Sequence, residues 1–454
     1  MKINPYKIRL AIAGIVGILS ILAVCGLFYP VKFMDIQFVP LLQRLFFDFS
    51  VITAVLFVGI IILTLIFGRF YCSTICPFGI LQEFVAVFIS KITKNSFPGR
   101  GRIGWGDIPV RYLIAGLTFG ALFGGSALLI RYIEPYTIFG SAFSLSIFGI
   151  IFVLVILAIV FFKNRFFCTN ICPVGAVLGL ISKISFNKIY IDENCVKCGM
   201  CAKNCPSGCI HKTPHPNSPK LGMEQFVVDN ETCVKCLKCF SVCPKGAIKY
   251  GIDRTPHPNP PQPGMEQKVK FNPKRRDFVW GMGALAFLGA GYAIGINFAK
   301  NLAKKVKDVI LPAGAVNANR MANKCLNCNL CINNCPNGIL SKSDDKFSTV
   351  HIDYEKGKHY CKYDCHKCSE VCPSGAIKKI SLEEKQNTRI GMASVSPHCI
   401  GCENCVKECP TGAISINEKR AVVDGSKCIG CGKCATVCKP QAIQIYGVND
   451  QSKI

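Results

Sequence analysis

The chemistry of this chain lies in its thirty cysteines, most of which fall in one repeated pattern. The run from Cys195 to Pro206 reads C-x2-C-x2-C-x3-C-P, and the chain carries this run or a near copy six times. Three thiolates on one tight loop can hold three corners of an iron–sulfur cubane, and the fourth cysteine, just ahead of proline, ligates a second cluster. Zinc sites and disulfide frameworks lack the repeated third and fourth cysteines followed by proline. The spacing therefore predicts [4Fe-4S] clusters.

Two of these runs lie together in residues 187–252, which we predict to be a two-cluster ferredoxin of the bacterial α+β type. Exchange of the fourth ligand between the two runs assigns two sets of four. The first cluster is expected on Cys195, Cys198, Cys201 and Cys243, and the second on Cys233, Cys236, Cys239 and Cys205. Cys209 belongs to neither set. It stands at the position that Ala247 holds after the second run, and we interpret it as a small buried packing residue.

Four more runs lie in residues 300–454, which we predict to be a four-cluster ferredoxin. The second of them has three residues instead of two between its first two cysteines. In the fourth, the proline follows the last cysteine by two places instead of one. We pair the first run with the second and the third with the fourth, and a nested pairing is the alternative. The expected ligands are Cys325, Cys328, Cys331, Cys335, Cys361, Cys365, Cys368, Cys372, Cys399, Cys402, Cys405, Cys409, Cys428, Cys431, Cys434 and Cys438.

A different cysteine motif, C-x3-C-P, occurs twice in residues 1–186. The segment from Arg69 to Gly79 matches that from Arg165 to Gly175 at an offset of 96 residues, so this part is an internal repeat. A pseudo-twofold axis would bring its four cysteines near one another: Cys72, Cys76, Cys168 and Cys172. They could jointly hold a further cluster or metal, or act as paired thiols, or only shape the helix ends.

Uncharged runs in the same region predict an α-helical membrane domain of four helices in two pseudo-repeated hairpins. The runs cover 10–29, 49–67, 112–130 and 135–162, and about 20 helical residues cross a bilayer. Basic residues concentrate before the first run and between the second and third, so the positive-inside rule places both ends of the unit in the cytoplasm. A multi-pass protein of the bacterial inner membrane follows from this pattern.

A fifth helix is expected over residues 278–299, after a Pro-rich linker at 253–277. Gly281-x-Gly283 and Gly289-x-Gly291 mimic a dinucleotide fingerprint, but no strand precedes them, so we interpret them as small residues for close helix packing. The preceding Lys274-Arg275-Arg276 resembles a twin-arginine export signal. A fifth span would put the last ferredoxin in the periplasm.

Composition narrows the function further. The formal charge of +26 lies largely beside apolar segments, where it indicates membrane topology rather than nucleic-acid binding. No histidine precedes His211, which argues against haem within the bilayer. No nucleotide loop or nucleophile–base pattern occurs, so a lipid-soluble quinol is the expected electron donor. Arg131, Glu134, Arg44 and Asp48 are the candidate quinol-site residues.

The arrangement resembles NapH-type membrane ferredoxins over residues 1–252, because these combine four helices, two C-x3-C-P motifs and a two-cluster ferredoxin. Residues 273–447 resemble the exported four-cluster ferredoxins of the NapG and MauM type. The resemblance implies a fusion of the two, a quinol dehydrogenase subunit that passes electrons to a periplasmic reductase, such as nitrate reductase, or to a cytochrome. The alternatives are a non-catalytic electron relay for another membrane complex, and a maturation or redox-sensing factor for metalloenzymes.

Overall fold

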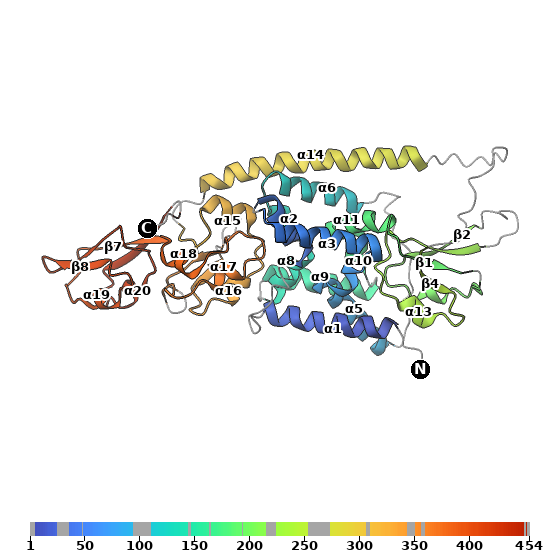
Figure 1. The fold of residues 1–454 in the computed structure, drawn as a ribbon, viewed down its shortest axis with the longest axis horizontal. Helices are drawn as coiled ribbons and strands as arrows, with labels where there is room; N and C mark the ends of the chain where they lie inside the picture. The colour runs from blue at the N-terminus through green and yellow to red at the C-terminus, as the bar shows by residue number, and fades with distance from the viewer. Residues whose placement is uncertain are drawn as a thin grey trace.

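A helical unit forms the middle of the molecule, with one ferredoxin module at each end (Figure 1). The computed structural model describes residues 5–24, 36–47, 49–93, 110–143, 147–162, 165–192, 194–214, 224–252, 273–305, 309–342, 350–355, 359–448 and 451. The N-terminal ferredoxin module (187–252) and the chain's N-terminus lie at one end of the long axis. The C-terminal ferredoxin module (309–448) lies at the other.

The helical unit is built from two copies of one pattern, a long apolar helix, a short helix carrying the first cysteine of a motif, and a helix begun by proline. The first copy is α3 (Val51–Phe67), α4 (Tyr71–Thr74) and α5 (Pro77–Thr93), and the second is α9 (Ile147–Phe162), α10 (Phe166–Asn170) and α11 (Pro173–Lys183). Proline suits the first helical position because its missing N–H would have no partner there. The other helices of the unit are α1 (Pro5–Val24), α2 (Phe38–Phe47), α6 (Val110–Phe123), α7 (Leu128–Ile133) and α8 (Pro135–Phe143).

Two of the expected long helices are broken in the structure. The run at 112–130 divides between α6 and α7, because Gly125 adopts a left-handed backbone (φ +89°) that ends the helix. The run at 135–162 divides between α8 and α9. In the described part, two helices are long and apolar enough to cross a membrane, Pro5–Ala23 and Gly281–Phe298, and five shorter apolar helices have 10–17 residues. The four-helix membrane domain therefore stays a prediction.

The fifth helix, α14 (Pro273–Lys305), is longer than expected and begins inside the predicted linker. It runs along α6 over most of that helix (Figure 1). A glycine row on each helix makes the close approach possible, because an added Cβ at Gly116 or Gly295 would come within 2.6 Å of a backbone carbonyl on the other helix. Gly281 and Gly289 have open space around them, so of the two expected glycine pairs only Gly291 lies in the tight interface.

Both ferredoxin modules consist of short helices and two-stranded antiparallel sheets, as expected for the α+β type. The N-terminal module pairs β1 (Lys188–Ile191) with β4 (Ile248–Gly251) and β2 (Ile210–Pro214) with β3 (Glu224–Val228), beside α12 (Met200–Lys203) and α13 (Lys238–Val242). The C-terminal module pairs β5 (Leu340–Lys342) with β6 (Val350–Ile352), β7 (Gly391–Val395) with β10 (Ile443–Gly447), and β8 (Ile414–Asn417) with β9 (Arg420–Val423). Its helices are α15 (Ala318–Lys324), α16 (Leu330–Asn333), α17 (Lys367–Glu370), α18 (Leu382–Gln386), α19 (Asn404–Glu408) and α20 (Lys433–Thr436).

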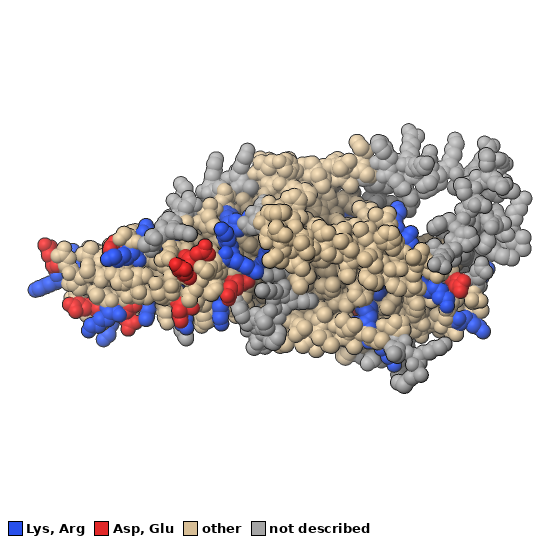
Figure 2. Space-filling model, viewed as in Figure 1, with Lys and Arg blue, Asp and Glu red and all other residues tan. Residues whose placement is uncertain are grey.

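Charged side chains are distributed unevenly over the surface. On the face shown in Figure 2, Lys, Arg, Asp and Glu gather over the two ferredoxin modules. The band between them, over the helical unit, is almost free of charged side chains.

Candidate redox centres

Five of the six C-x2-C-x2-C-x3-C runs share an unusual backbone. The second and fourth residues after the first cysteine are left-handed in each of them: Lys197 and Gly199, Lys235 and Leu237, Asn327 and Asn329, Gly401 and Glu403, Gly430 and Gly432. A left-handed residue other than glycine costs about 1–2 kcal/mol. The repetition of this cost in five loops indicates that the fold holds these positions for a functional reason.

The wider second run of the C-terminal module departs from this geometry. Between Cys361 and Cys368 no residue has a positive φ, which agrees with its three-residue gap. All six runs nevertheless share a left-handed residue three places after the fourth cysteine: Gly208, Gly246, Gly338, Gly375, Gly412 and Gln441. Sequence reasoning missed this position, although five of its six residues are glycine.

The N-terminal module brings its cysteines together in the two sets expected from exchange of the fourth ligand. Cys195, Cys198, Cys201 and Cys243 line one pocket. The Cys239 thiol interacts electrostatically with the thiols of Cys236, Cys233 and Cys205 of its own expected set, and also with Cys201 of the first set.

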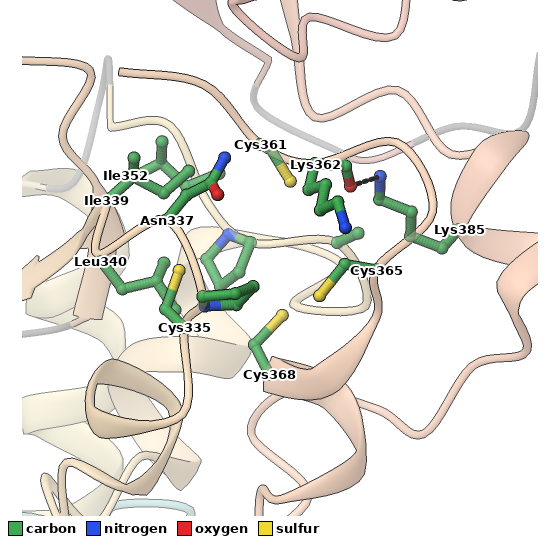
Figure 3. Close-up of a pocket in the computed structure, with 13 residues that line it drawn as sticks. Cys335, Asn337, Ile339, Leu340, Ile352, Cys361, Lys362, Cys365, Cys368 and Lys385 are labelled. Carbon is green, nitrogen blue, oxygen red and sulfur yellow. Dashed lines mark hydrogen bonds between the residues drawn. The ribbon is translucent and has the colours of Figure 1, made fainter. Parts of the chain in front are cut away.

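The C-terminal module brings together the first run with the second and the third with the fourth, so the structure does not have the nested arrangement. Figure 3 shows Cys335, Cys361, Cys365 and Cys368 around one pocket, and Cys409 lines another with Cys428, Cys431 and Cys434. In a third set, the Cys331 thiol interacts electrostatically with Cys325, Cys328 and Cys372, and also with Cys368 of the neighbouring set. In a fourth, the Cys405 thiol interacts with Cys399, Cys402 and Cys438.

The thiols of three of the expected sets line a pocket of their own. Among the described residues, no group of three or more His, Cys, Asp or Glu side chains is placed to hold a single metal ion. Backbone amides already point at the sulfurs: Ala413 N lies 3.3 Å from Cys409 Sγ, and Ala442 N lies 3.2 Å from Cys438 Sγ. Such hydrogen bonds stabilise the ligated thiolates and tune the potential of a bound cluster.

Two of the C-terminal pockets adjoin each other through the backbone. The Cys361 amide donates to the Cys431 carbonyl at 2.7 Å, and the Tyr354 hydroxyl donates to the Gly430 carbonyl. Burial raises the pKa of the Tyr354 hydroxyl well above its usual value, so this group stays a neutral donor at physiological pH. Gly432 packs on the Tyr354 ring, where a Cβ would not fit. Backbone contacts therefore join the second cysteine run of the module to the fourth.

The C-terminal module docks on the helical unit beside its first cysteine run. Arg131 Nε donates to the Cys325 carbonyl at 2.6 Å, and an Arg44 guanidinium nitrogen donates to the Cys372 carbonyl at 2.7 Å. Gly140 on α8 lies against Cys328, because an added Cβ would be 3.0 Å from that residue's carbonyl oxygen. These contacts place the set containing Cys328 directly at the end of the helical unit.

The candidate quinol-site residues therefore have structural contacts. Arg131 is buried against the C-terminal module, and the buried Glu134 carboxylate accepts hydrogen bonds from Thr137 N at 2.6 Å and Thr137 Oγ1 at 2.9 Å. Arg44 contacts the same module, and Asp48 lies outside the described residues. A quinol-site role for Arg131 and Glu134 stays a prediction.

The C-x3-C-P cysteines, Cys72, Cys76, Cys168 and Cys172, form a buried group that we call the cysteine quartet. The two halves cross over each other: Arg69 donates to the Cys168 carbonyl at 3.0 Å, and Arg165 donates to the Cys72 carbonyl at 3.2 Å. Each of these carbonyls also lies against a glycine of its own copy. The Cys72 carbonyl approaches Gly79 and the Cys168 carbonyl approaches Gly175, where an added Cβ would collide with it. The reciprocal contacts agree with the expected pseudo-twofold relation.

The pseudo-symmetry breaks where the N-terminal module docks. Glu83 follows Cys76 by seven residues and forms an ion pair with Arg165 at 2.5 Å, whereas Gly179 holds the equivalent place after Cys172. The absent side chain leaves room for Glu231 of the ferredoxin module, whose carbonyl accepts from Arg69 at 3.1 Å. The carboxylate of Glu231 pairs with Arg111 on α6.

The leftover cysteine of the N-terminal module contacts two expected ligands. Cys209 Sγ is 3.4 Å from Cys205 Sγ, and Cys233 also lies within hydrogen-bonding reach of the buried Cys209 thiol. An S–H group in this place donates to ligand sulfurs and favours the reduced, more negative cluster.

We expect Cys209→Ala to lower the reduction potential of the cluster on Cys205 and Cys233. A weak hydrogen bond of about 0.5–1 kcal/mol corresponds to about 20–40 mV for one electron. A redox titration followed by electron paramagnetic resonance measures the shift, with the neighbouring cluster on Cys195 as an internal reference. An unchanged potential, or an equal shift of both clusters, would contradict this role of Cys209.

Comparisons with known proteins agree with these sites. A model of the 4Fe-4S dicluster domain matches residues 194–247, 324–376 and 398–442, and a model of a 4Fe-4S binding domain matches 49–96 and 145–191. The YccM protein of Escherichia coli (strain K12) is 32% identical over 166 residues, which cover 34% of this chain and 45% of YccM. The ferredoxin-type protein NapG of the same organism is 30% identical over 151 residues, covering 30% of this chain and 61% of NapG.

A third relative is the methylamine utilization ferredoxin-type protein MauN of Paracoccus denitrificans (strain Pd 1222), 29% identical over 170 residues, covering 35% of this chain and 54% of MauN. The matches thus span roughly half the length of each of these relatives. The domain models and relatives together show several ferredoxin-type [4Fe-4S] domains in this chain.

Proposed function

We propose that this iron–sulfur electron-transfer protein of the ferredoxin type spans a membrane and carries electrons from quinol, through six [4Fe-4S] clusters, to a reductase or cytochrome on the far side. The ferredoxin-type electron-transfer character is the premise, because domain models and relatives both support it. The membrane, the quinol and the number of clusters are the proposal.

The observation that carries the proposal is the position of the two ferredoxin modules at opposite ends of the helical unit (Figure 1). The window Gly281–Phe298 of α14, which packs along α6 between the modules, would cover about 27 Å as a helix, close to the thickness of a bilayer core. The outer flanks of the unit expose large apolar side chains, each more than half exposed: Ile15, Ile52, Val55, Leu154 and Leu285. Contact of such an apolar surface with lipid is favourable, whereas its exposure to water is not.

The contacts at the two ends also support a path through the unit. At one end, Phe186 N donates to the Leu65 carbonyl at 2.8 Å, and Tyr250 Oη donates to the Phe67 carbonyl at 3.0 Å, which fixes the N-terminal module on α3. At the other end, Arg131 and Arg44 hold the C-terminal module. Under the positive-inside rule, the basic residues that the sequence carries in the loops at the first end favour a cytoplasmic position for it, and the C-terminal module would then be periplasmic.

A second candidate function is a relay that takes electrons from another membrane subunit. The structural contacts of Arg131 and Glu134 favour it, because they leave the two residues first considered for a quinol site with other partners.

The experiment that decides between the two uses the purified holoprotein and a reduced menaquinol analogue. We expect the visible absorbance of the clusters to bleach when the quinol alone is added, and a dimethyl ether of the same quinol, which cannot release its electrons, to leave it unchanged. Bleaching only after a second membrane subunit is added would favour the relay. A reporter fused after Ile454 checks the topology, and activity restricted to the cytoplasm would contradict the periplasmic module.

A further inference from the structure

We propose that an exposed face of the N-terminal ferredoxin module docks an acidic, soluble electron-carrier protein, which delivers electrons to this end of the chain. We call it the N-terminal docking face, and it consists of Val196, Lys197, Cys198, Met200, Lys203 and Lys245. The proposal goes beyond quinol oxidation, because it adds a protein partner in solution. It rests only on the ferredoxin-type character of the chain.

An exposed cysteine marks this face. Among the described cysteines only Cys198 and Cys402 are exposed, and each is the second cysteine of its run. Cys198 belongs to the N-terminal module and Cys402 to the C-terminal module, and these modules form opposite ends of the molecule (Figure 1). The sets that contain these two cysteines are therefore the ones that a second protein can approach most closely.

The other cysteine set of the N-terminal module faces the helical unit. Cys236 and Val234 belong to the same buried core as the helices. Lys235 is 1% exposed, whereas Lys197, at the equivalent place of the first run, is exposed. The set with Cys198 is therefore the one that a carrier from solution can reach.

The centre of the docking face is apolar. Val196 is 57% exposed and Met200 is 44% exposed, and both line the pocket that the cysteines of the Cys198 set share. Protein interfaces combine an apolar centre with a polar rim, and methionine adapts to the shape of a partner. The two side chains thus supply a contact patch directly beside the expected redox centre.

The rim of the docking face is basic. Lys245 is exposed and lines the same pocket as Val196 and Met200. Lys203 is exposed and follows Met200 by three places in α12, which puts the two side chains on one face of the helix. Lys197 stands between Val196 and Cys198. Three ammonium groups therefore surround the apolar centre.

Carboxylates of the module do not balance these lysines at the surface. Those whose burial the structure describes are Asp192, Asp229 and Glu231, and none of the three is exposed. Asp229 accepts a hydrogen bond from Thr232 Oγ1 at 2.6 Å, and Glu231 pairs with Arg111 of the helical unit. The docking face therefore has a positive surface potential, which attracts an acidic partner and repels a basic one.

The exposed set at the opposite end lacks this bias. Ile400 is 69% exposed and corresponds to Val196, so the apolar feature is present there too. Charges of both signs lie exposed nearby: Glu403, Lys407, Glu408, Glu418 and Lys419. The basic rim is thus particular to the N-terminal module and not a general property of the exposed cluster loops.

The chemistry of the exchange is a single-electron transfer. The reduced carrier loses one electron, the centre held by the Cys198 set gains it, and no bond forms or breaks. The carrier that fits is a small redox protein with carboxylates around its own exposed redox centre.

Stopped-flow reduction of the full-length holoprotein tests the docking face, with reduced plant-type [2Fe-2S] ferredoxin as the acidic probe. We expect the triple variant Lys197→Glu/Lys203→Glu/Lys245→Glu to be reduced at least about tenfold more slowly than the wild type at about 10 mM salt. At about 0.3 M salt the difference should largely disappear, because the Debye length falls below 10 Å. Photoreduced deazariboflavin, a small uncharged reductant, should reduce both proteins at the same rate.

The matched control places the same charge change at the other end, in Lys407→Glu/Lys419→Glu/Lys439→Glu, where all three lysines are exposed. Its reduction by the ferredoxin should match that of the wild type. Equal rates for the wild type and the N-terminal triple variant, or equal slowing in both triple variants, would overturn the proposal. A wild-type rate that falls by the same factor when phosphatidylglycerol is added to the detergent would also overturn it, because the lysines would then bind lipid headgroups.

Zero-length cross-linking supplies a readout that does not depend on electron transfer. A carbodiimide joins lysine amines to carboxylates in contact, so wild-type protein mixed with the ferredoxin should give cross-links at Lys197, Lys203 or Lys245. Cross-links found only elsewhere in the chain would overturn the proposal, and this result decides the question if the triple variant does not fold. Bleaching by quinol is measured separately, so the failure of this inference leaves the quinol-oxidising role standing.

Discussion

Replacement of Gly120 by isoleucine is expected to separate α14 from α6. An added Cβ at this position would collide with the Leu288 carbonyl of α14, and the collision involves backbone, which cannot rotate away. Overpacking of this kind costs about 3 kcal/mol, which weakens an association roughly a hundredfold. The measurement is made on a chain with a protease site placed between residues 253 and 272. After cleavage, we expect the fragment beginning at residue 273 to bind the remainder about a hundredfold more weakly in the variant than in the wild type, because the C-terminal module keeps its own contacts with the helical unit.

The matched control for this prediction is Gly289→Ile on α14 itself. The same residue is introduced, but an added Cβ at Gly289 meets nothing within 4 Å, so binding should be unchanged. Weakened binding of the fragment in both variants, or in neither, would show that the glycine rows do not determine the association.

The glycine rows illustrate how far the sequence could predict the packing. Small residues in a fifth helix correctly indicated close helix packing. The predicted pairs were spaced by two residues, whereas a helix presents residues four apart on one face. The interface accordingly uses Gly291 and Gly295, together with Gly116, Gly120 and Gly124 on α6. The partner helix could not be identified, because nothing in a single sequence says which helix lies next to which.

The candidate sites were predictable to different degrees for a physical reason. A cubane needs ligands at short, fixed separations along the chain, so the spacing of the cysteines specifies the loops. Pairing between distant runs depends on tertiary contacts, and the contact of Cys361 with Cys431 could not be expected from spacing. Arg69 and Arg165 occur at equivalent places of the repeat, which was a usable indication of a shared role, but the sequence does not show that both are buried.

The Glu83→Gln substitution is expected to destabilise the helical unit by about 3–5 kcal/mol, the cost of breaking a buried ion pair from one side. Glu83 is the carboxylate that both Arg9 and Arg165 contact, and all three side chains are almost inaccessible to solvent. Glutamine keeps the shape and can still accept a hydrogen bond, but it leaves two guanidinium charges without their carboxylate. Loss of helical circular dichroism on heating in detergent measures the effect as a lowered midpoint.

A solvent-exposed ion pair serves as the control, because its loss should not destabilise the protein in the way that loss of the buried pairs of Glu83 does. Lys433 and Glu408 also form an ion pair, at 2.8 Å, but both side chains are more than a third exposed, and such pairs contribute no more than about 1 kcal/mol. Glu408→Gln should therefore leave the midpoint nearly unchanged. If Glu83→Gln were equally mild, water would have to reach Arg9 and Arg165, and the burial of these two ion pairs would not determine their strength. A large difference between the variants would instead confirm that this layer is dry and that its charges need partners inside the protein.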